Sequence, residues 1–351
     1  MIHRRLGKTD LRLSEIGLGC QSLGGGLHHA GGRDALELVA AALDAGVSFF
    51  DTADHYSLGQ SEQLLGRALQ HVRQNVVIGT KVGTYYTPAA RTLLRMRPTV
   101  HSLGRWLRPF KHDFDRLRAT QRRGDFSLPY LRRAVGASLK RLRTDYIDLL
   151  HLHKPPVHLL RGGDIGAAIE GLLRDGSVRY VGVSCETADD AMDCLGISAI
   201  ASVQLTINLL EPESIARVLP AARERGIGVI ARNPRAAGLL TAGFGDVTAE
   251  TYALNRDEYE RSRDNARRFA FLATPQRSLA QAAIRYVLQL PGVDAAIPRA
   301  LGRRELREAL GAVATADLSP DELERISLTA RQLSVKPKQY SYRPVKPRAA
   351  S

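Results

Sequence analysis

Four ionisable side chains fall at or near the ends of three successive β-like runs of the chain. Asp51 and Tyr56 lie in FFDTADHY, Lys81 lies in VVIGTKVG, and His153 ends the run YIDLLHLH. One polar residue at a strand end would be unremarkable. Core packing does not explain three in succession, because buried ionisable groups need partners. A carboxylate, a phenol, an amine and an imidazole in these places predict a site of proton transfer.

The four side-chain types complement one another as a tuned acid. A free phenol is too weak an acid for neutral pH, and a neighbouring ammonium stabilises its phenolate form. A carboxylate beside the lysine keeps the ammonium charged and aimed, and a histidine can orient a carbonyl group or relay a proton. The set therefore predicts reduction of a carbonyl group. The alternative is a structural ion pair of Asp51 with Lys81, beside a tyrosine that caps a pocket.

The elements that would carry these groups alternate between short apolar runs and helical stretches that end at glycine. The predicted strands cover residues 13–19, 47–53, 75–82, 146–153, 180–184, 202–208, 228–234 and 294–299. The predicted helices follow them at residues 33–46, 61–70, 128–142, 165–176, 187–196, 212–226, 278–292 and 302–313. Such a repeat predicts an α/β fold, a closed parallel (β/α)8 TIM barrel. An open doubly wound sheet is disfavoured, because GLGCQSLGGG lacks the GxGxxG register of a dinucleotide fingerprint.

Three segments lie outside this repeat. Residues 3–13 predict an N-terminal β-hairpin that turns between Gly7 and Asp10. A long basic insertion after strand 3, residues 82–127, holds ten Lys and Arg against three Asp and Glu, together with Trp106. We expect it over the pocket mouth, as a lid for an anionic or large polar substrate, or else as a solvated flap or oligomer contact.

The chain end is predicted to stand apart from the barrel. Residues 331–351 are basic and carry prolines that exclude a continuous helix. The predicted organisation is a single barrel domain, residues 1–333, with a basic C-terminal tail, residues 334–351.

The bulk composition bounds the class of protein. The chain has 351 residues, 44% of them hydrophobic, and a net charge of +14 with a pI of about 10.0. The surplus is mostly arginine without a nucleic-acid-binding motif, so we expect no nucleic-acid partner. We find no signal-peptide pattern and no apolar run long enough for a membrane helix, so we expect no membrane contact. Three cysteines without metal spacing, Cys20, Cys185 and Cys194, predict a cytoplasmic location and no metal site.

Nearly the whole chain, apart from the insertion and the tail, resembles the aldo-keto reductase family. The opening RRLGKTDLRLSEIGLG is similar to the family's N-terminal hairpin, and FFDTADHY, GTKVG and DYIDLLHLHKP are similar to its aspartate–tyrosine, lysine and histidine motifs. VRYVGVS, SVQLTIN, SLAQAAIRYVL and GVDAAIPRA also match. The resemblance implies a (β/α)8 barrel that interconverts carbonyl and alcohol with NADP(H), and Asp51, Tyr56, Lys81 and His153 as catalytic residues. We expect His151, two residues before His153 on the same strand, to be a hydrogen-bonded core residue.

The resemblance also implies a binding site for the cofactor NADP(H). Ser184 matches a serine that holds the nicotinamide carboxamide, and Cys185 replaces the usual asparagine. Gln204 is expected to share in hydrogen bonding to this carboxamide. Arg232 replaces an aromatic residue that stacks on nicotinamide, and a guanidinium plane can also stack on a ring. The full set implied for the cofactor is Gly19, Cys20, Ser184, Cys185, Gln204, Arg232, Asn233, Pro234, Ile297, Pro298, Arg299, Arg303 and Arg304.

The segment after the eighth strand is implied to grip the 2′-phosphate of the cofactor. Arg299 occupies a basic position of the family, and Arg303 and Arg304 begin a helix whose N–H groups favour anions. Glu305 and Ala309 replace a second arginine and an adenine-contacting asparagine of the family. NADP(H) is therefore the expected cofactor, and the alternative is that these arginines are solvated surface charge.

The leading functional prediction is an NADP(H)-dependent oxidoreductase that reduces an aldehyde or ketone to an alcohol, with Tyr56 as proton donor. Its partner would be a small-molecule carbonyl substrate, sugar-like or anionic if the insertion acts as a lid. A sugar or cyclitol dehydrogenase that runs in the oxidative direction would use the same residues. A nucleotide-binding regulatory subunit of a channel, with little turnover, is a third alternative. Whether the chain is a monomer or a homo-oligomer is left open.

Overall fold

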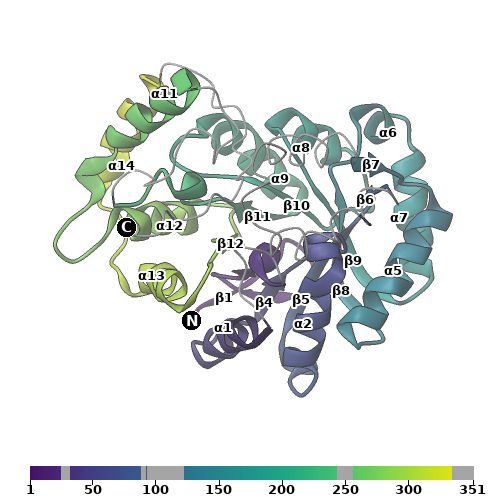
Figure 1. The fold of residues 1–351 in the computed structure, drawn as a ribbon. Coiled ribbons are helices and arrows are strands. Elements are labelled where there is room, and N and C mark those ends of the chain that lie inside the picture. The colour runs from purple at the N-terminus through teal and green to yellow at the C-terminus, as the bar shows by residue number, and fades with distance from the viewer. Residues whose placement is uncertain (25–31, 88–91, 93–121, 243–255, 334–351) are drawn as a thin grey trace, which may run out of the picture.

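The computed structural model describes residues 1–24, 32–87, 92, 122–242 and 256–333. Within them, eight parallel strands form one sheet, whose members in order are Leu18–Gly19 (β3), Phe49–Asp51 (β4), Val77–Val82 (β5), Ile147–His153 (β8), Val178–Ser184 (β9), Ser202–Thr206 (β10), Gly228–Arg232 (β11) and Ala295–Ile297 (β12). Parallel bridges from Ile16 to Ala296 and from Gly19 to Arg299 join the first strand to the last. The sheet therefore closes on itself (Figure 1), and the predicted (β/α)8 barrel is confirmed.

Helices surround the barrel and bury their apolar faces against the strands (Figure 1). The helices of the repeat are Gly32–Asp44 (α1), Gln60–Leu69 (α2), Leu128–Leu142 (α5), Asp164–Arg174 (α7), Ala188–Cys194 (α8), Leu219–Arg225 (α9), Leu279–Gln289 (α12) and Arg303–Ala314 (α13). Capping boxes at Thr187, Ser278 and Ser319 begin α8, α12 and the later helix Pro320–Arg331 (α14), because each side chain accepts the backbone N–H three residues further on. These starts are therefore encoded locally.

Among the described residues, three α-helices lie outside the predicted repeat: Val157–Arg161 (α6), Arg256–Arg267 (α11) and Pro320–Arg331 (α14). Tyr259 of α11 and Ile326 of α14 share a buried cluster with Leu279 of α12. The two longer helices therefore form an additional layer outside α12, which Figure 1 shows on one side of the barrel.

The N-terminal hairpin closes one end of the barrel. His3–Arg5 (β1) pairs with Arg12–Ser14 (β2) in antiparallel register, as the sequence predicts. Leu6 and Leu11 of its turn pack with Phe49 of β4 and other interior side chains at the start of the strands. The opposite end, where the strands finish, is therefore the end that remains for a site.

Two predicted elements are divided in the structure. The run 13–19 begins in the hairpin strand β2 and ends in β3, and the backbone between them bonds to Ala296 of the last strand. The predicted helix 212–226 consists of a π-turn, Ser214–Val218, followed by α9. Pro220 has no N–H for the carbonyl one turn earlier, which disrupts the regular helical ladder there.

The described ends of the insertion 82–127 form a two-stranded ribbon. Thr84–Tyr86 (β6) pairs with Arg122–Gly124 (β7) in antiparallel register. Trp106 and the tail 334–351 lie outside the described residues. The ribbon follows β5 directly, so the insertion starts at the end of the barrel where the strands finish.

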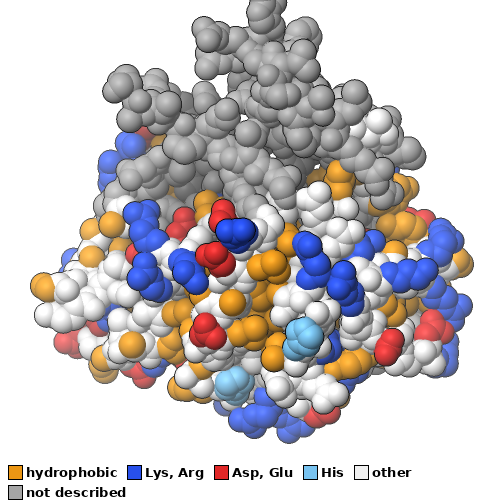
Figure 2. Space-filling model, turned by 60° about the horizontal axis from the view of Figure 1, so that its bottom comes forward, with side chains coloured by type: hydrophobic (Ala, Val, Ile, Leu, Met, Phe, Trp, Pro, Cys, Tyr) orange, Lys and Arg blue, Asp and Glu red, His pale blue; other side chains and the backbone are white. Residues whose placement is uncertain are grey.

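The surface that faces the viewer in Figure 2 carries Lys and Arg side chains scattered among Asp and Glu, rather than one basic patch. The net charge of +14 is therefore not concentrated at one place on this face. None of the helices in the described part of the chain is long and apolar enough to cross a bilayer.

Candidate active site

The predicted catalytic residues point into the barrel at the C-terminal ends of their strands. Phe49 and Leu149 line the interior near the hairpin. Side chains alternate along a strand, so Asp51, two residues after Phe49, and His153, four residues after Leu149, face the same interior further along. Lys81, near the end of β5, joins them through its ion pair with Asp51. The structure thus brings three of the four groups to one mouth.

The Asp51–Lys81 pair is buried and fully hydrogen-bonded on the carboxylate side. The Lys81 ammonium donates to Asp51 Oδ2 at 2.6 Å and to the Thr52 carbonyl at 2.8 Å, and the residue is only 1% exposed. Gln204 Nε2 donates to the other carboxylate oxygen, Asp51 Oδ1, at 2.7 Å. Burial pulls the pKa of Lys81 down, but Asp51 and Tyr56 outweigh it and raise that pKa above its ordinary value. The lysine is therefore a fixed positive charge.

Tyr56 reaches this charge because the chain turns tightly after β4. It begins the short 3-10 turn Tyr56–Gly59, in which Ser57 and Leu58 have positive φ values of 49° and 58°. Left-handed backbone costs non-glycine residues about 1–2 kcal/mol each, and such strain is concentrated at functional sites. The Lys81 ammonium lies 5.2 Å from the centre of the Tyr56 ring. Tyr56 itself is half-buried, so a ligand in the mouth can reach it.

His153 is part of a cluster of aromatic polar rings that the sequence analysis did not identify. Its imidazole stacks on His55 with ring centres 4.8 Å apart, and His55 packs edge-on against Tyr56 at 5.0 Å and against Tyr86 at 6.2 Å. His55 Nδ1 lies 3.2 Å from Asp54 Oδ1. The mouth therefore presents two imidazoles and two phenols, and Tyr86 is contributed by the insertion ribbon.

His55 was missed because it precedes Tyr56 directly, and neighbouring residues of a strand face opposite ways. The strand has already ended at Asp51, and His55 has helical backbone angles, so the alternation no longer applies. The position of His55 next to Tyr56 in FFDTADHY was the only signal available.

His151 is the core residue that the sequence predicts. Its side chain is fully buried, and its Nε2 lies 3.1 Å from Ser202 Oγ. Burial first, and then the charges of Lys81 and Arg232, hold its pKa well below the ordinary value. His151 is therefore a neutral imidazole one layer beneath the mouth.

Ser184 and Gln204 continue the buried hydrogen-bond chain around the barrel. Both are fully buried, and Ser184 Oγ donates to Gln204 Oε1 at 3.3 Å. Because the Gln204 amide also donates to Asp51, both of its polar atoms have partners within the chain. The chain Ser184–Gln204–Asp51–Lys81 links a predicted cofactor residue to the predicted catalytic set.

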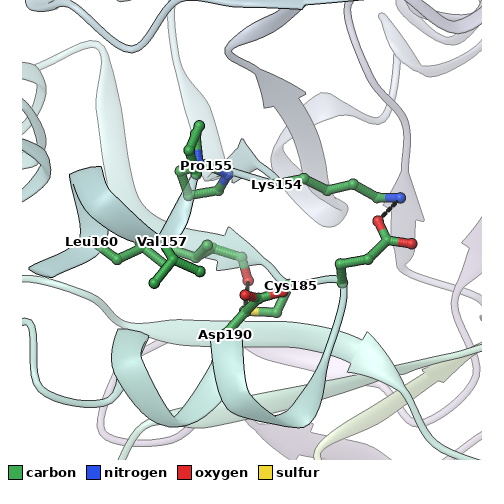
Figure 3. A pocket seen from close by; sticks show the side chains of 9 residues that line it. Lys154, Pro155, Val157, Leu160, Cys185 and Asp190 are labelled. Atoms are coloured by element: carbon green, nitrogen blue, oxygen red, sulfur yellow. Dashed lines mark hydrogen bonds and ion pairs between the residues drawn. The ribbon is translucent and has the colours of Figure 1, made fainter. Parts of the chain in front are cut away.

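The thiols of Cys185 and Cys20 lie in the outer core, between strands and helices. Cys185 Sγ is 3.7 Å from Cys194 Sγ of α8, and this contact, followed by burial, raises its pKa well above the ordinary value. Figure 3 shows Cys185 on the wall of a hollow of about 310 Å³ between α6 and α8, outside the barrel. Burial, followed by the Asp51 charge, likewise raises the pKa of Cys20 well above the ordinary value. Neither thiol is presented to the mouth.

Arg232 ends β11 and faces the interior, two residues after Ile230 of the buried cluster near the hairpin. Its Nη2 donates to the Cys185 carbonyl at 2.5 Å. Its Nε is enclosed and has no hydrogen-bond acceptor in the described part of the chain. Asn233 follows with a positive φ of 53°, and Pro234 is buried behind it. The guanidinium is therefore anchored at one nitrogen and unsatisfied at another.

The end of β12 forms the far side of the mouth. Ile297 and Pro298 are buried, Arg299 is half-buried, and Gly19 of β3 packs against this backbone. Arg235, on the loop after β11, donates to the Arg299 carbonyl and so joins the two loops. This link was not foreseen from the sequence.

The start of α13 differs in part from the phosphate-binding segment implied by the resemblance. Arg303 and Arg304 are exposed in its first turn. Glu305 Oε2 accepts the Leu301 N–H at 2.9 Å, so one backbone donor and the local positive potential are already used by a carboxylate. Ala309 is 1% exposed and packs in the outer core, so that position faces the barrel wall.

Comparison with known proteins bears directly on this arrangement. A family model described as the aldo/keto reductase family matches residues 15–329. The chain belongs to the aldo-keto reductase family. An uncharacterised oxidoreductase of Bacillus subtilis, YqkF, is 30% identical over 337 residues, which are 95% of this chain and 97% of that protein. The L-galactose dehydrogenase of Arabidopsis thaliana is 28% identical over 247 residues, or 68% of this chain and 66% of that one.

Solved aldo-keto reductase structures share the fold. The holo form of the aldo-keto reductase AKR11C1 from Bacillus halodurans superposes with a TM-score of 0.75 at 27% identity, covering 97% of this chain and 99% of the other. The glycerol dehydrogenase AKR11B4 from Gluconobacter oxydans superposes with a TM-score of 0.73 at 23% identity, covering 99% of each chain, and its likeness concerns the fold alone.

Aldo-keto reductases use NAD(P)H, and the residues at the mouth fit such a dinucleotide. The observation that supports the fit is the enclosed Nε of Arg232, a donor for which the described residues provide no acceptor. At the β12 end, the half-buried guanidinium of Arg299 gives a second cation. Within the described residues, no group of three His, Cys, Asp or Glu side chains is arranged to hold a metal ion.

Proposed function

We propose that this protein catalyses the NADP(H)-dependent reduction of an aldehyde or ketone to an alcohol, with Tyr56 donating the proton. The observation that carries the proposal is the buried Lys81 ammonium, held by Asp51 at 2.6 Å and lying 5.2 Å from the centre of the Tyr56 ring. Proton donation leaves a phenolate, and the ammonium stabilises that charge. Asp51 keeps the ammonium protonated and in place.

His153 is the residue that we propose orients the substrate. Bound NADPH would supply the hydride. His153 lies beside the acid, with its ring fixed by the stack on His55, and its imidazole is the proposed donor that orients the carbonyl oxygen toward Tyr56. A carbonyl group held between Tyr56 and His153 would already be positioned to receive the proton from Tyr56.

We further propose that the protein prefers NADPH to NADH because Arg299 binds the 2′-phosphate. A guanidinium–phosphate contact is charge-assisted and suits the half-buried position of Arg299. Arg303 and Arg304 add solvated charge at the start of α13, where Glu305 already accepts a backbone N–H. Arg299 is therefore the main determinant in this proposal.

The proposed substrate is sugar-like or anionic. The insertion 82–127 carries a strong positive surplus, and its ribbon contributes Tyr86 to the rings around His55. Thr84 Oγ1 donates to the His153 carbonyl at 2.9 Å, which ties the base of the insertion to a proposed catalytic residue. Imidazoles and phenols can donate and accept hydrogen bonds, so this wall suits a polyhydroxylated compound better than an apolar one.

A second candidate is the oxidative direction on a sugar or cyclitol. The same ring cluster favours it, and a relative at 28% identity is named L-galactose dehydrogenase. Tyr56 would then act as the base, assisted by the same ammonium. A regulatory nucleotide-binding subunit is the remaining candidate, and it would retain cofactor without turnover.

We also propose a cytoplasmic location and a single barrel domain of residues 1–333 with a tail of residues 334–351. Cys20, Cys185 and Cys194 are free thiols in the structure, which suits a reducing compartment.

The test is the consumption of NADPH across a panel of carbonyl compounds that includes simple aldehydes, phosphosugars and nucleotide-linked sugars. Polyols with NADP⁺ should be assayed in parallel. The proposal predicts turnover in the reductive assays, with sugar-like or anionic carbonyls preferred. Turnover only with polyols and NADP⁺ would favour the oxidative candidate, and tight binding without any turnover would contradict an enzymatic role.

A further inference from the structure

The His55 imidazole contacts both groups to which the proposed mechanism assigns a step. It stacks on His153 with ring centres 4.8 Å apart and ring planes inclined by 25°. The same ring meets Tyr56 edge-on, with 5.0 Å between ring centres and an angle of 71° between planes. One buried ring therefore touches the proposed acid and the proposed orienting imidazole.

The main chain of His153 is fixed, but its ring needs a further support. His153 pairs with Ser184 in the parallel register of β8 and β9, and its carbonyl accepts a hydrogen bond from Thr84 Oγ1 at 2.9 Å. The side chain itself restricts rotation of the imidazole about the bond to its ring only weakly. An N–H that orients a carbonyl group must be aimed at one point, so contacts with the ring must select its rotation.

His55 is held firmly enough to give that support. The Asp54 carboxylate lies 3.2 Å from its Nδ1, and the Asp54 N–H donates to the Lys81 carbonyl at 3.0 Å, which ties this loop to the end of β5. Tyr86 of the ribbon packs edge-on against the His55 ring, with 6.2 Å between ring centres. The His55 side chain is only 5% exposed, so its neighbours block its rotation.

The ribbon at the base of the insertion presents Tyr86 to the mouth through strand alternation. Thr84 and Tyr86 lie on one face of β6, because alternate residues of a strand share a face. Tyr85 between them packs on Tyr130 of α5, with ring centres 5.4 Å apart. The base of the insertion is thus fixed from outside the mouth and contacts both histidines within it.

We propose that His55 is a positioning residue, which fixes the ring rotation of His153 by stacking and so aims that imidazole at a carbonyl group beside Tyr56. The inference rests on the proposed carbonyl reduction. Tyr56 depends less on His55, because the tight turn that Tyr56 begins and the nearby Lys81 ammonium place its ring. The alternative is that His55 only fills space at the mouth.

The experiment compares three replacements of His55 in the full-length protein. His55→Phe keeps a flat ring for the stack but loses the bond to Asp54, His55→Leu keeps bulk without a flat face, and His55→Ala removes both. His71→Ala, at an exposed position after α2, is the control for loss of a surface histidine. The measurements are single-turnover oxidation of NADPH with glyceraldehyde as the probe, NADPH affinity, the urea midpoint, and the ring rotation of His153 in crystals of each variant.

We expect His55→Ala and His55→Leu to slow the chemical step by about 10- to 100-fold, since misplacement of a reacting group by about 1 Å can cost about 100-fold. His55→Phe should keep most of the wild-type rate, because its ring can still stack on His153. NADPH affinity should be unchanged in all three variants, and His71→Ala should match the wild-type protein in every measurement. The His153 ring should take a single rotation in the wild-type protein and in His55→Phe, and a different or mixed rotation in His55→Ala.

A double-mutant cycle shows whether His55 acts through His153. His153→Phe removes the proposed donor, so the addition of His55→Ala to it should cause little further loss of rate. If the two losses multiplied instead, His55 would act independently of His153, and the inference would be wrong.

Two other results would also overturn the inference. If His55→Leu were as fast as His55→Phe, or His55→Phe as slow as His55→Ala, a flat stacking ring would not be the property that matters. If His153 kept its wild-type ring rotation in crystals of His55→Ala, the stack would not be what aims it. This last result is independent of turnover. Absence of NADPH oxidation by the wild-type protein with glyceraldehyde and with the whole carbonyl panel would instead overturn the proposed function.

Discussion

Replacement of Lys81 by methionine tests the buried ammonium on which the proposed mechanism depends. Methionine fills similar space without a charge, so Tyr56 loses the cation whose nitrogen lies 5.2 Å from its ring centre. At this distance and an effective dielectric constant of about 20, two unit charges interact by about 3 kcal/mol. Only part of a unit charge develops on the phenol during proton transfer, so we expect the chemical step to slow by about 10- to 100-fold.

The same substitution removes one partner of a buried ion pair. Asp51 would keep its hydrogen bond from Gln204 but lose the charge that neutralises it. Breaking a buried pair in this way costs about 3–5 kcal/mol of unfolding free energy. Lys81→Met should therefore lower both the rate and the denaturation midpoint, and the two effects must be separated.

The matched control is the double variant Asp51→Asn with Lys81→Met. An asparagine still accepts the Gln204 amide but carries no charge, so most of the lost stability should return. The rate should not return, because the ammonium is still absent. Single-turnover oxidation of NADPH at saturating substrate, read beside urea unfolding curves, measures both quantities. A double variant with the wild-type rate, or a folded Lys81→Met protein with more than half of it, would refute the mechanism.

Three further changes test the proposed cofactor site and the fold. Arg299→Ala should weaken NADPH binding by about tenfold or more and leave NADH binding nearly unchanged, because it removes one charge-assisted phosphate contact; equal wild-type affinities for the two cofactors would contradict the assignment. Burial raises the pKa of Glu62 although Arg141 Nε lies 2.6 Å from its carboxylate; the ionised form is therefore less favoured in the fold than a neutral group, and Glu62→Gln should leave the urea midpoint at neutral pH unchanged or raise it, while a clear fall would argue against this reasoning. Burial raises the pKa of Asp294 to about 6. The folded protein then binds the extra proton, so stability falls as the pH rises from about 4 to 6, by up to roughly 3 kcal/mol. Asp294→Asn should flatten that part of the stability curve, and parallel curves for the two proteins would exclude this cause.

The barrel could be predicted from the sequence because its strands are buried on both faces. Such strands appear as short continuous apolar runs, and the ionisable residues near their ends stand out against them. Asp51, Lys81 and His153 follow from this contrast together with strand alternation. The outward direction of Cys185 follows from the same alternation, since Ser184 before it faces inward.

Other features depend on tertiary contacts that the local sequence pattern does not predict. Helix α11, RDEYERSRDNAR, has almost no apolar stripe, and it is held by the packing of Tyr259 and Ala266 with α12 and α14. His55 joins the site only because the chain turns after β4. The hydrogen bond that Glu305 accepts from the Leu301 N–H could not be predicted from the sequence, because no helix-start pattern pairs these two positions.

The central claim is that Tyr56 donates the proton in carbonyl reduction, and the most direct test is a single-turnover comparison of Tyr56→Phe with the wild-type protein. Phenylalanine keeps the ring over the Lys81 ammonium and removes only the hydroxyl. We predict that NADPH oxidation by a saturating carbonyl substrate slows by about 10²- to 10⁴-fold, the usual effect of a positioned general acid, with NADPH affinity unchanged. A Tyr56→Phe protein that oxidises NADPH at more than half of the wild-type single-turnover rate would contradict the claim.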